Sequence, residues 1–106
     1  MSIKDQKTEE LIKHLAADFL HKESSGLSLI TVTNVIIENR GQQATILVSV
    51  FPEDKQDDAL DFAKRKRTEF REYLKNNAKI GKIPRVDFAI DLGEKNRQRI
   101  EEISAT

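Results

Sequence analysis

The sequence predicts a single α+β domain in which helices cover one face of a three-stranded sheet, in the order α-β-β-α-kink-α-β. Three observations lead to this prediction: apolar pairs at helical spacing near the start, two adjacent runs rich in β-branched residues, and one strictly alternating run near the end. A chain of 106 residues can build one hydrophobic core but not two. We therefore expect residues 1–106 to form one domain, frayed at 1–7 and 104–106.

The first half predicts a helix followed by a hairpin. Over Thr8–Glu23, apolar residues recur in pairs one helical turn apart and form a single buried stripe. Residues 28–38 and 43–51 are rich in valine, isoleucine and threonine, as strands are. The intervening Asn39-Arg40-Gly41-Gln42 contains a glycine suited to a tight turn, so the two strands are expected to pair antiparallel.

A second helical segment is expected over Asp57–Asn76, with an interruption at its middle. Its apolar line passes through Leu60, Ala63, Phe70 and Leu74 and has a gap at Lys66 or Arg67. Four consecutive basic residues, 64–67, point around almost the whole circumference of a helix, so a straight helix would turn one charge toward the core at a large energetic cost. We predict a kink at Lys66, Arg67 and Thr68, with Thr68 as the N-cap of the second half. The alternative is a long side chain that snorkels out from the edge of the core.

The last strand is expected over Arg85–Asp91, because Val86, Phe88 and Ile90 alternate with polar residues. The sequence leaves open whether the tail over residues 94–103 adds a short helix or frays.

Positive charge is concentrated between Lys64 and Arg85, although the chain as a whole is neutral. This stretch holds nine basic and two acidic residues, a local charge of +7. We call the nine basic residues the basic strip: Lys64, Arg65, Lys66, Arg67, Arg71, Lys75, Lys79, Lys82 and Arg85. Such segregation predicts an anion-binding surface, and the sugar-phosphate backbone is the commonest partner. Tyr73 is the one candidate for stacking on bases, which favours recognition of the shape and backbone of a structured RNA.

Two other functions are compatible with the residues. A protein-interaction module could dock an acidic partner through the basic strip. A metal-dependent enzyme could use His14 and His21, which share a helix face with Asp18, but no fourth ligand is apparent and a solvated face explains these side chains better. No motif supports catalysis, a cofactor or a small-molecule substrate, and the absence of cysteine excludes a disulfide framework.

Location and assembly follow from the same patterns. No apolar run approaches the length of a membrane helix, and the first residues lack the apolar core of a signal peptide. We therefore expect a cytoplasmic protein without a membrane partner. Nothing in the sequence demands more than a monomer.

Several short motifs, taken with the order of elements, suggest a family. They are Thr31-Val32-Thr33-Asn34-Val35, residues 44–50, the stretch from Lys82 to Phe88, Asp91, and Arg99-Ile100-Glu101-Glu102-Ile103. In sequence and spacing, from about Thr8 to Ile103, they resemble the bacterial ribosome-binding factor A family.

The resemblance implies a type II KH-like domain in which a kink between two helices replaces the usual Gly-x-x-Gly loop. It also implies a non-catalytic RNA-binding factor that binds the small (30S) ribosomal subunit and its 16S rRNA. Such a factor would promote subunit maturation, including processing of the 16S rRNA 5′ end, with a role in cold adaptation. The chain departs from the family pattern in its neutral net charge and at the kink, where Lys66-Arg67-Thr68 stands in place of Ala-x-Gly.

Overall fold

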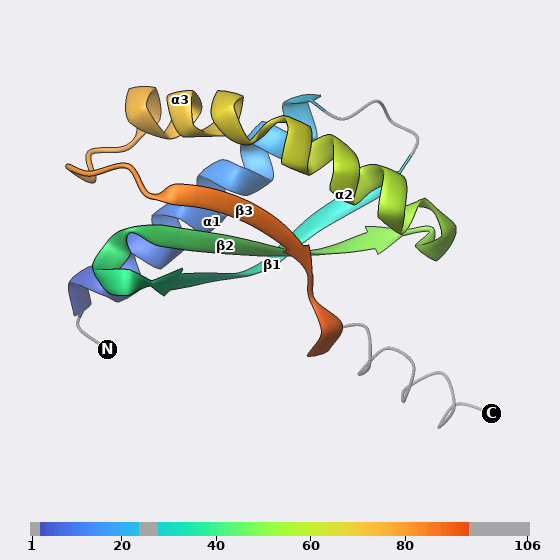
Figure 1. The fold of residues 1–106 in the computed structure, drawn as a ribbon, viewed down its shortest axis with the longest axis horizontal. Helices are drawn as coiled ribbons and strands as arrows, with labels where there is room; N and C mark the ends of the chain where they lie inside the picture. The colour runs from blue at the N-terminus through green and yellow to red at the C-terminus, as the bar shows by residue number, and fades with distance from the viewer. Residues whose placement is uncertain (1–2, 24–27, 94–106) are drawn as a thin grey trace.

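The computed structural model describes residues 3–23 and 28–93, which form helices and strands in the predicted order (Figure 1). In chain order the elements are α1 (Ile3–Glu23), β1 (Leu29–Glu38), β2 (Gln43–Phe51), α2 (Gln56–Arg65), α3 (Arg67–Asn77) and β3 (Arg85–Ile90). Two short 3-10 segments, η1 (Asn39–Gly41) and η2 (Glu53–Lys55), flank β2. The α+β class, the element order and the kinked helix pair are confirmed.

Helix α1 begins at Ile3, earlier than the Thr8 that the apolar pairs predict. Residues 4–7 are all polar, so the buried stripe gives no signal there. Lysine and glutamine nevertheless have good helix propensity and extend the helix toward its start. At the other end, the predictions for residues 94–103 (a short helix or fraying) and for 104–106 (fraying) concern positions outside the described residues.

The sheet has the strand order β1-β2-β3, with β1 and β2 antiparallel and β2 and β3 parallel. A parallel pair needs a crossover, which α2 and α3 supply. Ile46 in the central strand lies opposite Val35 on one side and Phe88 on the other. All three are buried, and the helices cover this face of the sheet (Figure 1).

Strand β1 carries a bulge at Thr33, which is left out of the pairing between Val32 and Asn34. The Thr33 hydroxyl donates to the Asp91 carboxylate at 2.5 Å and lies 3.2 Å from a β2 carbonyl, so the bulge is tied to the end of β3. Next to the bulge, the Asn34 side-chain oxygen accepts the Val35 N–H at 2.9 Å. The bulge changes the strand's alternation and allows both Val32 and Val35 to point into the core.

An aromatic cluster joins the helices to the sheet. Phe70 of α3 and Phe88 of β3 are completely buried, with ring centroids 6.0 Å apart, and Phe19 of α1 lies 5.2 Å from Phe70. Burying each such ring contributes about 2–3 kcal/mol relative to leaving it exposed. Phe70 therefore connects α1 and β3 immediately beyond the kink.

The opposite face of the sheet is partly solvated. Along β2, the residues that alternate with the buried ones are only half-buried, and Phe51 at its end is 72% exposed. Its partner in register, Leu29, is 63% exposed. Within the described ranges, no helix is both long and apolar enough to cross a membrane.

Candidate nucleic-acid interface

The basic strip follows the end of α2, the whole of α3, the next loop and the start of β3. The loop after α3 leads back into β3, which runs beside α3, so the strip lies on neighbouring elements of the fold (Figure 1). Lys64 and Lys66 are half-buried. The remaining seven are exposed: Arg65, Arg67, Arg71, Lys75, Lys79, Lys82 and Arg85. The structure thus places most of the predicted contact residues where an anion can reach them.

The kink is located at Lys66, whose φ of −94° and ψ of 6° are not helical. The Lys66 N–H donates to the Ala63 carbonyl at 3.0 Å and closes α2, while its carbonyl accepts the Phe70 N–H at 2.9 Å and opens α3. Ala63 and Phe70 are both fully buried. Between these two anchors, Lys66 stays half-exposed, with its ammonium group 3.4 Å from the Glu69 carboxylate. A straight helix would have turned one of the four basic side chains toward the core, and the break at Lys66 avoids this.

The prediction that Thr68 caps the second helix is wrong. Residue Lys66 occupies the N-cap position of α3, and Thr68 lies exposed inside its first turn. The break falls at Lys66, the first residue of the predicted stretch, because the Lys66 N–H turns back to the Ala63 carbonyl. No side-chain hydrogen bond caps α3 at Lys66.

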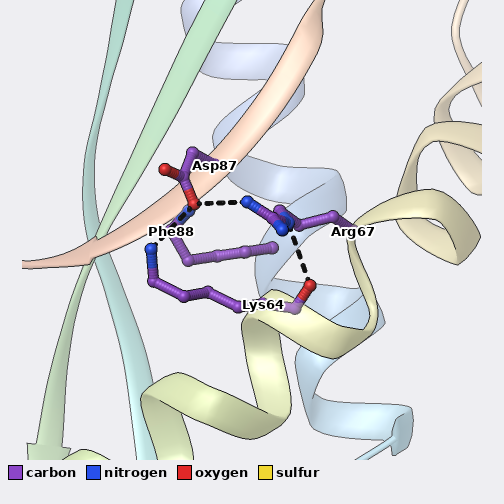
Figure 2. A network of polar contacts seen from close by, with 4 residues as sticks. All are labelled: Lys64, Arg67, Asp87 and Phe88. Atoms are coloured by element: carbon purple, nitrogen blue, oxygen red, sulfur yellow. Dashed lines mark hydrogen bonds and ion pairs between the residues drawn. The ribbon is translucent and has the colours of Figure 1, made fainter.

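Asp87 of β3 connects both sides of the kink, as Figure 2 shows. One carboxylate oxygen accepts from Lys64 Nζ at 3.1 Å and from Arg67 Nη1 at 3.3 Å. The same oxygen accepts the backbone N–H of Phe88 at 2.8 Å. In addition, Arg67 Nε donates to the Lys64 carbonyl at 3.0 Å, one of the carbonyls that a helix end leaves without an internal partner. We call Lys64, Arg67 and Asp87 the kink clamp.

The electrostatics of the kink clamp favour an ionised carboxylate. Partial burial of Asp87 disfavours its charge, but the hydrogen bonds from Lys64 and the Phe88 N–H, with the charges of Lys64 and Arg67, outweigh burial and lower the pKa of Asp87 below its usual value. Two of the strip's nine cations, Lys64 and Arg67, are therefore already paired with the Asp87 carboxylate. Sequence reasoning missed Asp87, because alternation placed it on the polar face of the last strand.

A shallow hollow beside the kink contains acidic as well as basic side chains. It is lined by Asp58, Asp61, Lys64, Arg65 and Arg67. Its carboxylates, together with Asp87, offset much of the positive charge that the sequence concentrates here. The four consecutive basic residues are thus a weaker anion site than their number indicates.

Arg71 holds the loop before β3. Its Nε donates to the Pro84 carbonyl at 3.1 Å and its Nη2 to the Ile83 carbonyl at 3.4 Å. These contacts fix the guanidinium group against the loop that leads into Arg85. Arg71 therefore has a structural role besides any contact with an anion.

Tyr73, the expected stacking residue, is half-buried. Its ring centroid lies 5.6 Å from that of Phe19, and the Lys22 ammonium group lies 5.5 Å from the ring centre. The ring thus already packs against Phe19 and the Lys22 ammonium group.

The histidine face of α1 is solvated. His14 and Asp18 lie 3.4 Å apart, with the His14 side chain 76% exposed, and His21 is exposed. Across residues 3–23 and 28–93, no three histidine, cysteine or carboxylate side chains are arranged to hold a metal ion.

The sequence profile described as Ribosome-binding factor A matches residues 4–104, almost the whole chain. The chain belongs to the ribosome-binding factor A family. The fold is similar to the crystal structure of ribosome-binding factor A from Thermus thermophilus, with a TM-score of 0.69 and 24% identity over 77% of this chain and 90% of that chain. A search of curated proteins returned no match.

Two further structures share the fold. One is the solution NMR structure of a Thermotoga maritima protein described as a candidate ribosome binding factor A, with a TM-score of 0.65 and 20% identity over 79% of this chain and 83% of that chain. The other is a Thermus thermophilus ribosome-binding factor A homology model fitted into a cryo-EM map of a 30S complex, with a TM-score of 0.66 and 21% identity over 76% and 88% of the two chains. The expected KH-like fold is therefore confirmed.

This member of the ribosome-binding factor A family bends its helix pair with Lys66-Arg67-Thr68. No glycine is needed there, because the φ of Lys66 is negative and accessible to any residue. Side chains of the kink clamp, rather than a special backbone conformation, join the two helices to β3.

Proposed function

We propose that this protein binds the immature small ribosomal subunit and promotes its maturation, including processing of the 16S rRNA 5′ end. Membership of the ribosome-binding factor A family carries the proposal. It is supported by the similar Thermus thermophilus protein that was fitted into a map of a 30S complex. The protein would act by binding, without a cofactor and without breaking a bond itself.

The contacts with rRNA would come from the basic strip. Its seven exposed cations lie on α2, α3, the following loop and β3, so an RNA backbone crossing this region would meet several of them. Each phosphate contact releases condensed counterions, which makes binding strongly dependent on salt. Because few aromatic rings are available, the backbone and shape of the RNA would be recognised more than its sequence.

Co-sedimentation with ribosomal particles tests the proposal. The protein is expected to sediment with free small subunits and their precursors, and depletion of the protein from its cells is expected to leave 16S rRNA with an unprocessed 5′ end, measured by primer extension. Association that survives complete ribonuclease digestion and requires only an acidic protein would contradict the proposal and favour the protein-interaction alternative.

The kink clamp determines which variants are suitable. Replacing Lys64 and Arg67 would remove two ion pairs with Asp87. A loss of RNA binding in such a variant could then come from reduced stability of the protein. Arg65, Lys75 and Lys79 are exposed and have no such contact within the described residues, which makes Gln substitutions there the cleaner test. A variant with five substitutions adds Lys82→Gln and Arg85→Gln to these three. If its sedimentation with small subunits is unchanged, the basic strip does not contact RNA.

A further inference from the structure

A second hollow lies at the hairpin end of the sheet, away from the kink. It is partly enclosed, about 430 Å³ in volume, and forms where η1 approaches the start of β3. We call it the hairpin hollow and define it by three basic and three amide side chains: Arg71, Lys82, Arg85, Asn39, Gln42 and Gln43. Its volume falls within the range of about 300–1,000 Å³ that is usual for small-molecule sites.

Among the residues that the structure describes, no carboxylate lines the hairpin hollow. Its three cations are accompanied by amides and one apolar residue, whereas the hollow at the kink has three cations and two aspartates. A concave surface lined by charge of one sign concentrates the potential and attracts counterions. The hairpin hollow is therefore the stronger anion site of the two.

Backbone contacts hold the hollow in shape. The Arg85 N–H donates to the Gln42 carbonyl at 2.8 Å, and the Gln42 N–H donates to the Asn39 carbonyl at 3.2 Å. Asn39, Arg40 and Gly41 have φ values of 53°, 56° and 86°, so a run of three left-handed residues turns the hairpin back toward this site. The turn and the start of β3 thus form one continuous wall.

Arg71 is positioned in advance for a phosphate group. Two of the five N–H donors of its guanidinium group bind the Ile83 and Pro84 carbonyls, which fixes its orientation. A guanidinium that is already ordered loses less conformational entropy when it binds an anion. Lys82 and Arg85 are exposed beside it.

We propose that the hairpin hollow binds one unpaired RNA nucleotide, with its phosphate on the three basic side chains and its ribose or base edge on the three amides. Amide groups both donate and accept hydrogen bonds, as recognition of a ribose 2′-hydroxyl or a base edge requires. Only a nucleotide that is unstacked from its neighbours can enter such a hollow. The inference rests on the proposed function for the identity of the RNA as rRNA.

An NMR titration of the labelled protein tests the hollow itself. The probes are hexamers of uridylate and of adenylate, each as RNA and as DNA, with inorganic phosphate as a control. The side-chain amide signals of Asn39, Gln42 and Gln43 are expected to shift with RNA and to shift less with DNA. Shifts confined to residues at the kink, or equal shifts with inorganic phosphate alone, would overturn the inference.

Gln42→Glu provides a nearly isosteric test on small subunits. The two side chains have almost the same shape, so the fold is expected to be retained. The new carboxylate lies among the three cations and competes with a phosphate for them. Affinity for small subunits is therefore expected to fall about tenfold near 0.1 M salt. The matched control is Gln56→Glu in the first turn of α2, which changes the net charge equally and lies outside the hollow. Equal losses for the two variants would overturn the inference.

A charge-matched pair of double variants completes the experiment. Lys82→Gln/Arg85→Gln removes two cations of the hollow, and Lys75→Gln/Lys79→Gln removes two neighbouring cations outside it. The first variant is expected to reduce the slope of log affinity against log salt by about 2, and the second by less than about 1. If the wild-type protein binds small subunits and both variants match it, the hollow inference fails while the proposed function stands. If the wild-type protein does not bind, the proposed function itself fails.

Discussion

The kink and the hairpin hollow carry similar numbers of basic residues but differ in what those residues already contact. At the kink, Lys64 and Arg67 share the Asp87 carboxylate, and Lys66 lies beside Glu69. In the hairpin hollow no described lining residue is acidic. The density of charge along the sequence is highest at the kink, whereas the charge available to a ligand is higher at the hollow.

This difference separates two uses of a basic residue. An arginine or lysine at the kink stabilises a junction between elements, and an external phosphate would have to compete with Asp87 for it. A phosphate that binds an arginine or lysine of the hairpin hollow does not have to displace a carboxylate from the described lining residues. Of the two regions, the hollow should therefore respond more strongly to RNA and the kink more strongly to changes in stability.

The largest expected effect tests how firmly the kink depends on the core. Phe70→Ala removes a fully buried ring one helical turn after Lys66, and the free energy of unfolding should fall by about 3–5 kcal/mol, measured by urea denaturation. The exposed Lys79→Ala serves as the control and should stay within about 0.5 kcal/mol of wild type. A loss below about 1 kcal/mol for Phe70→Ala would mean that the helix pair is not anchored as described.

The next effect compares the two regions as RNA contacts. Lys82→Gln/Arg85→Gln should weaken binding to small subunits on the order of 50-fold near 0.1 M salt, as expected for two lost phosphate contacts. Lys64→Gln/Arg67→Gln should weaken it by less than about tenfold, because those cations are partly neutralised by Asp87. Filter binding across a salt series measures both. The reverse ranking would contradict the comparison.

Asp87→Asn should lower the free energy of unfolding by about 1 kcal/mol, a modest value because the side chain is 39% exposed and solvent screens its ion pairs. The lowered pKa of Asp87 gives the pH dependence its sign. The stabilisation is present above the unfolded-state pKa of about 3.9 and is lost as pH falls through the lower folded-state pKa. Thermal melts of both proteins should therefore differ at neutral pH and converge only once the pH falls below the lowered folded-state pKa of Asp87. Glu72→Gln, which removes an exposed carboxylate from the middle of α3, is the control.

The smallest effect concerns Thr68. Because Lys66 occupies the cap position and Thr68 is exposed within the helix, Thr68→Ala should change the free energy of unfolding by no more than about 0.5 kcal/mol. An N-cap threonine would cost about 1 kcal/mol or more when replaced by alanine. A loss of that size in chemical denaturation would restore the original assignment.

The strands and the kink were predictable because each depends on residues close together in sequence. The alternation of β3 and the β-branched runs of β1 and β2 place the strand bounds within a residue or so of those observed. The kink followed from a gap in an apolar line at Lys66. Thr68 was assigned wrongly because a hydroxyl near a break suggests a cap, while the break itself depends on which backbone carbonyl the Lys66 N–H reaches.

The candidate site was less accessible to sequence reasoning. Asp87 and Lys64 are 23 residues apart, and only the approach of α2 to β3 brings them together. The amide side chains of the hairpin hollow lie in and next to the turn between β1 and β2, and the sequence indicates a turn there but no binding site. They become candidates when parallel pairing sets Gln43 opposite Arg85. Charge counting found the cations but could not show which of them were already paired.

Two backbone N–H groups donate to the side chain of the residue just before them: Phe88 to Asp87, and Val35 to Asn34. They lie on β3 and β1, the two outer strands of the sheet. An unpaired N–H on an outer strand is a template onto which another chain can add a strand. Here the side chain of the preceding residue occupies a donor on each side, and on β3 two cations crowd the same position. These two donors are therefore not available to a strand that another chain might add.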